Sequence, residues 1–61
     1  MNVKNLGIPI YGEGTYRYVL VEDLKLALDS DVFERVMNQP KSTRYGPDGE
    51  GILVTWLENQ H

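Results

Sequence analysis

The tripeptide Gly-Glu-Gly occurs twice, at residues 12–14 and 49–51, and it is the pattern most suggestive of ligand binding. A phosphate-binding loop requires a strand, then glycines, then a helix whose free N–H groups face the anion. Each copy here is instead followed by a run typical of a strand, and its glutamate would repel a phosphate group. The sequence therefore predicts that the glycines only bend the chain in two hairpins.

Few other side chains could support metal binding or catalysis. Cysteine is absent and the only histidine is His61, so one chain can build neither a thiolate site nor a histidine cluster. A hydrolytic triad would have to use His61, which nothing is expected to hold in place. Calcium prefers oxygen ligands, but the twelve-residue calcium loop is missing around the candidate acids Glu13, Asp48 and Glu50. We expect a protein that is not an enzyme and binds no metal or cofactor.

The balance of charged residues does not favour nucleic acid as a partner. Nine acids stand against six bases, and the net charge is −3. A nucleic-acid binder usually carries a basic stripe, which this sequence lacks. The acids are too scattered to imitate DNA, which carries one charge per ~1.7 Å. No apolar stretch reaches the roughly 18 residues of a membrane span and no signal peptide is evident, so we expect a cytoplasmic location.

The elements that position these residues follow from hydrophobic periodicity. Apolar residues alternate over 6–10, which predicts a short strand, and Pro9 would confine it to an edge. Residues 15–21 are rich in β-branched and aromatic types and predict its partner strand. Turn residues over 46–51 precede a third candidate strand at 52–57.

Between the hairpins the spacing of apolar residues becomes helical. It predicts helices over 22–29 and 32–38, or one long helix bent near Ser30, with Asp31 and Glu34 spaced as in a capping box. The expected fold is a single α+β domain over 1–61 with ββ-α(α)-ββ order, in which antiparallel hairpins pack on the helical segment. Residues 1–5 and 59–61 are expected to be loosely held.

The strand patterns predict an interaction surface. Both faces of the strands at 15–21 and 52–57 carry apolar residues, although so short a helical segment covers only one face of a sheet. A chain of this length buries only about 60% of its surface on folding, so its stability is marginal. Its composition leaves association with another chain as the way to increase that stability. We therefore expect a homodimer or a protein-bound accessory, regulatory or inhibitory factor of bacterial or phage scale. The expected contact residues are Arg17, Tyr18, Val19, Val21, Leu53, Trp56 and Leu57.

Two further hypotheses remain open. Aromatic and basic residues alternate in two places, as on surfaces that stack and neutralise single-stranded nucleic acid; the candidates are Tyr16, Arg17, Tyr18, Lys41, Arg44 and Tyr45. Alternatively, the chain is an acidic decoy that occupies a nucleic-acid site on another protein through Glu13, Asp48 and Glu50.

Residues 16–28, with Gly14 before them, carry a further pattern, formed by Gly14, Tyr16, Arg17, Tyr18, Asp23, Leu24 and Leu28. It resembles the wing and following helix of excisionase-type and MerR-type winged-helix DNA-binding proteins. Between Arg17 and Asp23 the spacing is one residue longer than in that family. The family's recognition helix precedes the wing, where this chain has only residues 1–10. The resemblance therefore implies a module without the DNA-reading element, which favours a protein partner.

Overall fold

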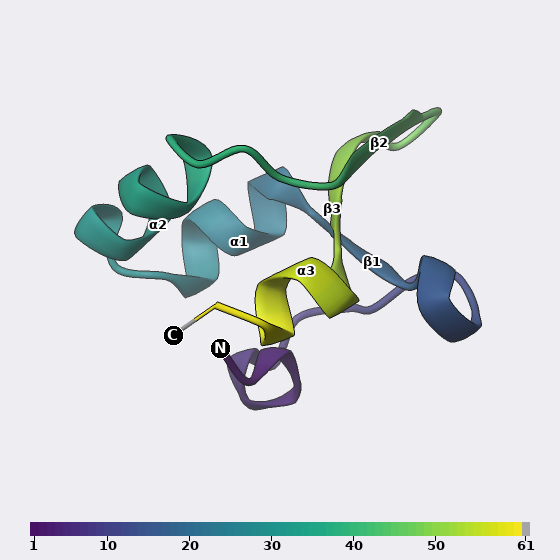
Figure 1. Ribbon diagram of the computed structural model, residues 1–61, viewed down its shortest axis with the longest axis horizontal. Helices are drawn as coiled ribbons and strands as arrows, with labels where there is room; N and C mark the ends of the chain where they lie inside the picture. Colours follow the sequence, from purple (N-terminus) through teal and green to yellow (C-terminus); the bar gives the residue numbers. More distant parts are fainter. Residues whose placement is uncertain (61) are drawn as a thin grey trace.

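The structure is a computed structural model, in which residues 1–60 are described, and it has the expected α+β fold (Figure 1). A three-stranded antiparallel sheet packs with three α-helices, and two short 3-10 helices precede the first strand. The elements in chain order are η1 (Val3–Leu6), η2 (Gly14–Tyr16), β1 (Tyr18–Leu20), α1 (Val21–Ala27), α2 (Ser30–Met37), β2 (Thr43–Gly46), β3 (Gly49–Leu53) and α3 (Val54–Glu58). His61 lies outside the described residues.

Strand β3 is the centre of the sheet, and the strand order is β1-β3-β2. Val19 is paired with Ile52, and both side chains are fully buried on what we call the core face. Because successive residues of a strand point to opposite faces, the neighbouring positions lie on the other side. We call that side the open face, and it carries Tyr18, Leu20, Arg44, Gly51 and Leu53.

All three α-helices contribute a buried apolar side chain to the core that includes the core face. Leu24 of α1, Val36 of α2 and Leu57 of α3 join Val19 and Ile52 in one buried cluster. Two residues of the open face, Tyr18 and Leu20, are also buried but lie outside this cluster. No residue of the open face is fully exposed either, because Tyr18, Leu20 and Gly51 are buried and Arg44 and Leu53 are half-buried, so the expectation of a bare apolar sheet face is wrong. The β2–β3 hairpin extends away from α2 (Figure 1).

The N-terminal part differs from the predicted hairpin. Residues 3–6 form a 3-10 helix, and Val3, expected in a loosely held end, is fully buried. The predicted strand over 6–10 is wrong, and only Tyr11 pairs with Tyr18, through two backbone hydrogen bonds of 2.9 Å. Gly7 has φ +69 and Pro9 lacks an N–H donor, so a ladder cannot extend through this segment.

The two-helix prediction is confirmed, with an extended residue, Leu28, between α1 and α2. The capping-box prediction is wrong, because Asp29 rather than Asp31 is the N-cap and no side-chain cap bond forms. Asp31 instead lies in the first turn of α2, where its charge complements the helix dipole.

Lys41 stabilises the other end of α2. Its ammonium group donates to the backbone oxygens of Met37 at 2.9 Å and Gln39 at 3.2 Å. We expect Lys41→Met to lower the free energy of unfolding by about 1 kcal/mol, because helix-terminal carbonyls lose a charged donor. Urea unfolding followed by the fluorescence of Trp56 measures the loss. Lys25→Met is the control, because this exposed lysine also lies in the last turn of a helix, α1, and the comparison therefore separates the hydrogen bonds of Lys41 from the effect of charge near a helix end; equal losses in both variants would contradict the capping role.

The C-terminal strand is shorter than predicted. Strand β3 ends at Leu53, and the predicted strand residues 54–57 belong to α3. A short, continuous apolar run has no period that separates strand from helix. The second Gly-Glu-Gly is also only partly a bend, because Gly49 has φ +107 beside the turn while Gly51 lies inside β3. The first copy bends as expected, with positive φ at Gly12 and Gly14.

Candidate functional site

The structure separates the predicted contact residues into core and surface. Val19 and Leu57 are completely buried among side chains of the same chain, so the prediction that they contact a partner is wrong. Val21 and Trp56 are half-buried and pack against that same core. Trp56 lies on α3 rather than on the sheet. A Val19→Asp variant would therefore report on folding, not on binding.

The remaining contact candidates lie on or beside the open face. Tyr18 and Leu53 are paired neighbours there, and Leu53 is half-buried. Arg17 precedes β1, and its Nε donates to the backbone oxygen of Gly14 at 3.1 Å. The structure thus brings Tyr18 and Leu53 together, with Arg17 at the entrance to the strand.

Tyr18 is the centre of a group that we call the tyrosine–arginine cluster, formed by Tyr11, Tyr18 and Arg44. The rings of Tyr11 and Tyr18 are stacked, with 5.6 Å between centroids and 29° between planes. The guanidinium carbon of Arg44 lies 4.0 Å from the centroid of the Tyr18 ring. Tyr11 lies outside the named strands and pairs with Tyr18 of β1, and Arg44 lies in β2. Because β3 lies between β1 and β2, the cluster extends across all three strands.

Gly51 makes this arrangement possible. It lies in β3, between β1 and β2, and the Tyr18 ring passes over it. A Cβ at position 51 would lie 2.7 Å from Cδ2 of Tyr18 and 3.2 Å from the backbone oxygen of Val19. The missing side chain therefore leaves the space through which Tyr18 reaches toward Arg44.

The cluster has a cationic and aromatic character. Stacked rings and an arginine over a ring each contribute about 0.5–1.5 kcal/mol. Tyr18 is 9% exposed, whereas Tyr11 is 37% exposed and Arg44 is half-buried. The outer members therefore face solvent, while Tyr18 fixes their positions. Sequence analysis missed Tyr11, and the available signal was a tyrosine on each side of the first glycine-rich segment.

The side chains of the nucleic-acid hypothesis are dispersed. Tyr16 in η2 and Tyr45 in β2 are 77% and 76% exposed, and the Tyr45 hydroxyl lies 3.4 Å from the Glu50 carboxylate. The three candidate cations contact the protein's own atoms, since Lys41 and Arg17 donate to backbone oxygens and Arg44 lies on Tyr18. This arrangement holds each cation locally rather than lining a common groove for phosphates.

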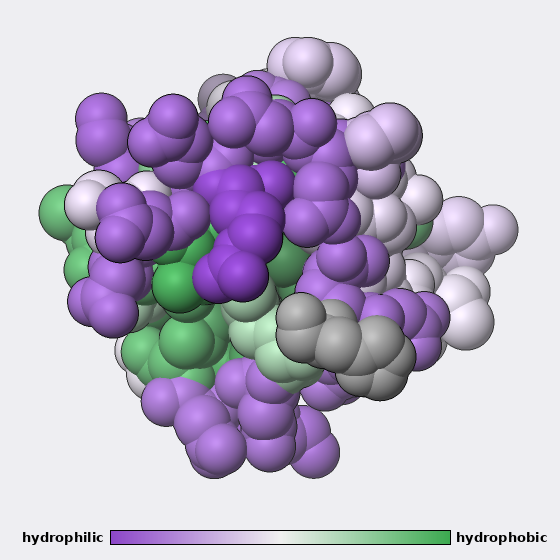
Figure 2. All heavy atoms as spheres, turned by 60° about the vertical axis from the view of Figure 1, so that its left-hand side comes forward, coloured by the Kyte–Doolittle hydropathy of each residue, from purple (hydrophilic) through white to green (hydrophobic). Residues whose placement is uncertain are grey.

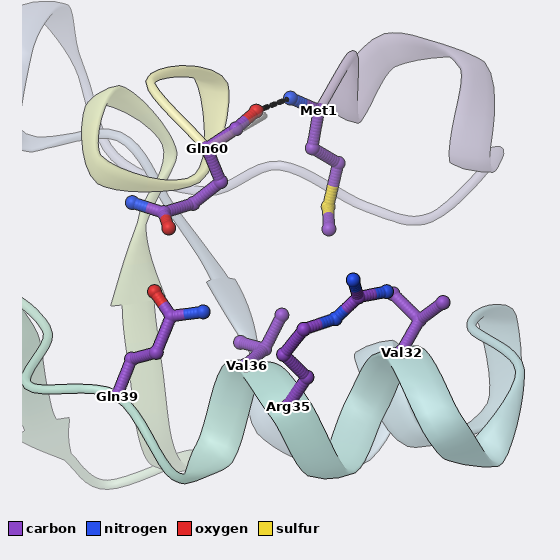
Figure 3. A pocket seen from close by; sticks show the side chains of 6 residues that line it. All are labelled: Met1, Val32, Arg35, Val36, Gln39 and Gln60. Atoms are coloured by element: carbon purple, nitrogen blue, oxygen red, sulfur yellow. Dashed lines mark hydrogen bonds between the residues drawn. The ribbon is translucent and has the colours of Figure 1, made fainter.

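A pocket of about 200 Å³ lies between α2 and the residues at the two ends of the described chain (Figure 3). The amine of Met1 donates to the backbone oxygen of Gln60 and joins these ends. On the side of the molecule that α2 forms, hydrophobic surface lies among strongly hydrophilic side chains (Figure 2). The pocket lining shows the same mixture: Met1, Val32, Arg35, Val36, Gln39 and Gln60. Sequence analysis missed this site.

Other kinds of site are not supported in the part of the chain that is described. Among residues 1–60, no three or more acidic, histidine or cysteine side chains come together in a way that could hold a metal ion. No helix within the same range combines the length and apolar character needed to cross a membrane.

Comparison with known proteins gives no relative for this chain: no protein-family model, no curated protein and no solved structure matches it.

Proposed function

We propose that the protein is a non-catalytic protein-binding module that engages its partner through the open face of the sheet. The observation that carries the proposal is that all three α-helices contribute to the core face, while the open face presents the tyrosine–arginine cluster. Tyrosine and arginine are enriched at the energetic centres of protein interfaces. Tyrosine also supplies contact area at a low cost in conformational entropy.

The edge strand β2 extends this surface. The backbone N–H of Leu53 donates to the oxygen of Ser42 at 3.0 Å, which fixes the alternation of the ladder. The register then directs the backbone groups of Thr43 and Tyr45 away from β3. An edge of this kind accepts an added strand from another protein.

The size of the molecule determines what share of its surface a stable interface must cover. Its accessible surface is 4194 Å². A stable interface of ordinary size covers about 800 Å² on each partner, or roughly a fifth of this surface. The tyrosine–arginine cluster is too small for that, so we propose that the edge of β2 takes part. The partner is either a second copy or another protein, and the chain acts as an accessory, regulatory or inhibitory factor. The absence of cysteine fits a cytoplasmic setting.

Tyr11→Glu tests this proposal, because it places a carboxylate on the exposed side of the cluster. Tyr16→Glu is the matched control, since Tyr16 is 77% exposed and lies in η2 outside the strands. The solution mass is first measured by light scattering from micromolar to millimolar concentration. A dimer that Tyr11→Glu dissociates and Tyr16→Glu preserves would identify a second copy as the partner.

If the wild type is monomeric, the three immobilised chains are compared for proteins retained from a bacterial lysate. Retention by the wild type and by Tyr16→Glu, together with loss in Tyr11→Glu, supports the open face as the site. Identical retention by all three chains, or no specific retention by any, contradicts the proposal.

Nucleic-acid binding is the competing outcome. We expect no anisotropy change for a labelled single-stranded oligonucleotide at physiological salt, because Arg17, Lys41 and Arg44 contact the protein's own atoms. Binding that weakens steeply as salt rises, and that is lost in Arg44→Gln, would instead favour the nucleic-acid hypothesis.

A further inference from the structure

We infer that the edge of β2 accepts an extended segment of a different protein, in which an acidic residue lies beside Arg44 between two β-branched or aromatic residues. The inference rests on the proposed function, because it specifies the partner of the same surface. Three observations carry it: the direction of the backbone groups of β2, the position of Arg44, and the exposure of Thr43 and Tyr45.

The outer edge of β2 has the geometry that strand addition requires. Strand β2 lies at one end of the order β1-β3-β2, and it belongs to the hairpin that extends away from α2 (Figure 1). The backbone groups of Thr43 and Tyr45 point away from β3, and both residues are exposed. Two N–H and two C=O groups therefore face outward, and an extended backbone presents complementary groups to all four at the spacing of a strand.

Arg44 gives this edge its charge. Among the residues of the three described strands, it is the one charged side chain on the open face, because Glu50 is paired with Tyr45 and projects from the opposite face. The guanidinium carbon of Arg44 lies over the Tyr18 ring. Stacking uses the flat face of a guanidinium group, whereas its N–H donors lie in the plane and match the two oxygens of a carboxylate.

The guanidinium group also lies close to the edge itself. A Cβ added to Gly46, which belongs to β2, would be 2.9 Å from Nη2 of Arg44. Directly opposed side chains of neighbouring strands have Cβ atoms only about 4.5–5.5 Å apart. A carboxylate on the residue of the added strand beside Arg44 is therefore within reach of these donors.

The same arginine disfavours a second copy as the occupant. A two-fold pairing that uses the outward groups of both Thr43 and Tyr45 is centred on Arg44, so it places two arginines directly opposite one another. Like charges in opposed positions are destabilising. A centre at Tyr45 would pair Thr43 with Pro47, which has no N–H, and a centre at Thr43 would need Lys41, which lies outside β2. A different protein with an acid at the central position meets none of these obstacles.

The residues on either side of the acid lie next to Thr43 and Tyr45. In an added strand, the neighbours of the residue beside Arg44 project from the other face, as these two side chains do. Tyr45 is 76% exposed, and contacts of an aromatic ring with β-branched or aromatic residues stabilise neighbouring strands. The segment that fits this edge therefore carries an acid between two residues of those types.

The probe is the peptide acetyl-Thr-Val-Glu-Val-Thr-amide, titrated into the isotopically labelled full chain while backbone amide shifts are recorded by NMR. We expect saturable shifts at the amides of Thr43 and Tyr45, with a dissociation constant on the order of 1 mM, as suits so short a segment. The same peptide with glutamine in place of glutamate should bind at least about fivefold more weakly, because it lacks the charge-assisted bond. Equal affinity for the two peptides, or no saturable shift with the glutamate peptide, would overturn the inference.

Three variants complete the experiment. Arg44→Gln should remove the preference for the glutamate peptide. Tyr45→Pro removes an outward N–H that β3 does not use, so the sheet keeps its pairing while peptide binding is lost. Tyr45→Val keeps that N–H and should still bind. A preference for glutamate that survives in Arg44→Gln, or equal affinity in Tyr45→Pro and Tyr45→Val, would overturn the inference.

Failure of this inference and failure of the proposed function give different results. If the peptide does not bind while Tyr11→Glu still abolishes retention of the partner, the open face remains the binding site and strand addition at its edge is overturned. If the peptide binds while Tyr11→Glu leaves retention unchanged, strand addition is supported and the role of the tyrosine–arginine cluster is overturned. A dimer that protects the amides of Thr43 and Tyr45 from hydrogen exchange would assign the edge to a second copy and overturn the inference.

Discussion

Replacing Leu24 with alanine is expected to remove most of the stability of this protein. Leu24 is fully buried where α1 meets the core face of the sheet. Truncation of a buried leucine costs about 2–5 kcal/mol, through lost burial and the cavity left behind. At about 0.05–0.15 kcal/mol per residue, a domain of 61 residues is stable by about 3–9 kcal/mol. We therefore expect the midpoint of urea unfolding of Leu24→Ala to lie close to zero urea.

Leu26 provides a control within the same helix. It lies two positions after Leu24 and is 88% exposed, so Leu26→Ala removes the same atoms from water rather than from the core. We expect Leu26→Ala to change the free energy of unfolding by no more than about 0.5 kcal/mol. Urea titrations followed by far-ultraviolet circular dichroism and by Trp56 fluorescence measure both variants. Similar losses in the two would contradict the orientation of α1 on the sheet.

The parts of the fold that could be predicted from the sequence are those with a clear period. Leu24 and Leu28 mark one helix, and Val32 and Val36 mark the next at the same spacing of four, so α1 and α2 were located to within one or two residues. Val54–Leu57 lacks such a period. Its conformation is decided by tertiary contacts, since the Val54 N–H donates to the oxygen of Arg17 at 2.9 Å and Leu57 is fully buried.

The candidate sites could be predicted only in part, for a similar reason. Tyr18 was found because alternation within a strand assigns it to a face. Its contact with Arg44 depends on the strand order, which places β2 on the far side of β3, and on the space above Gly51. The pocket depends on residues that are still farther apart in the sequence, because Met1 and Gln60 meet beside α2. No local pattern contains that information.

Gly51→Ala is expected to have the second large effect, because it tests the space on which the tyrosine–arginine cluster depends. The added methyl group would lie 2.7 Å from a ring carbon of Tyr18 and 3.2 Å from the backbone oxygen of Val19. The ring cannot move freely, since Tyr11 and Arg44 contact it. Overpacking of this kind costs about 1–3 kcal/mol. Urea unfolding measures the loss of stability.

Gly46→Ala is the comparison, because its added methyl group would meet only the guanidinium end of Arg44, at 2.9 Å. Only the end of one side chain would have to shift there, whereas at position 51 a ring carbon and a backbone oxygen both obstruct the methyl group, so we expect a smaller loss than in Gly51→Ala. Tyr18→Val removes the ring carbon, and Gly51→Ala should then cost at least about 1 kcal/mol less than it does in the wild type. An equal cost in both backgrounds would mean that the sheet backbone, and not Tyr18, requires the glycine. Coupling between positions 18 and 51 would instead show that the absence of a side chain at position 51 keeps Tyr18, the centre of the proposed binding surface, in its position.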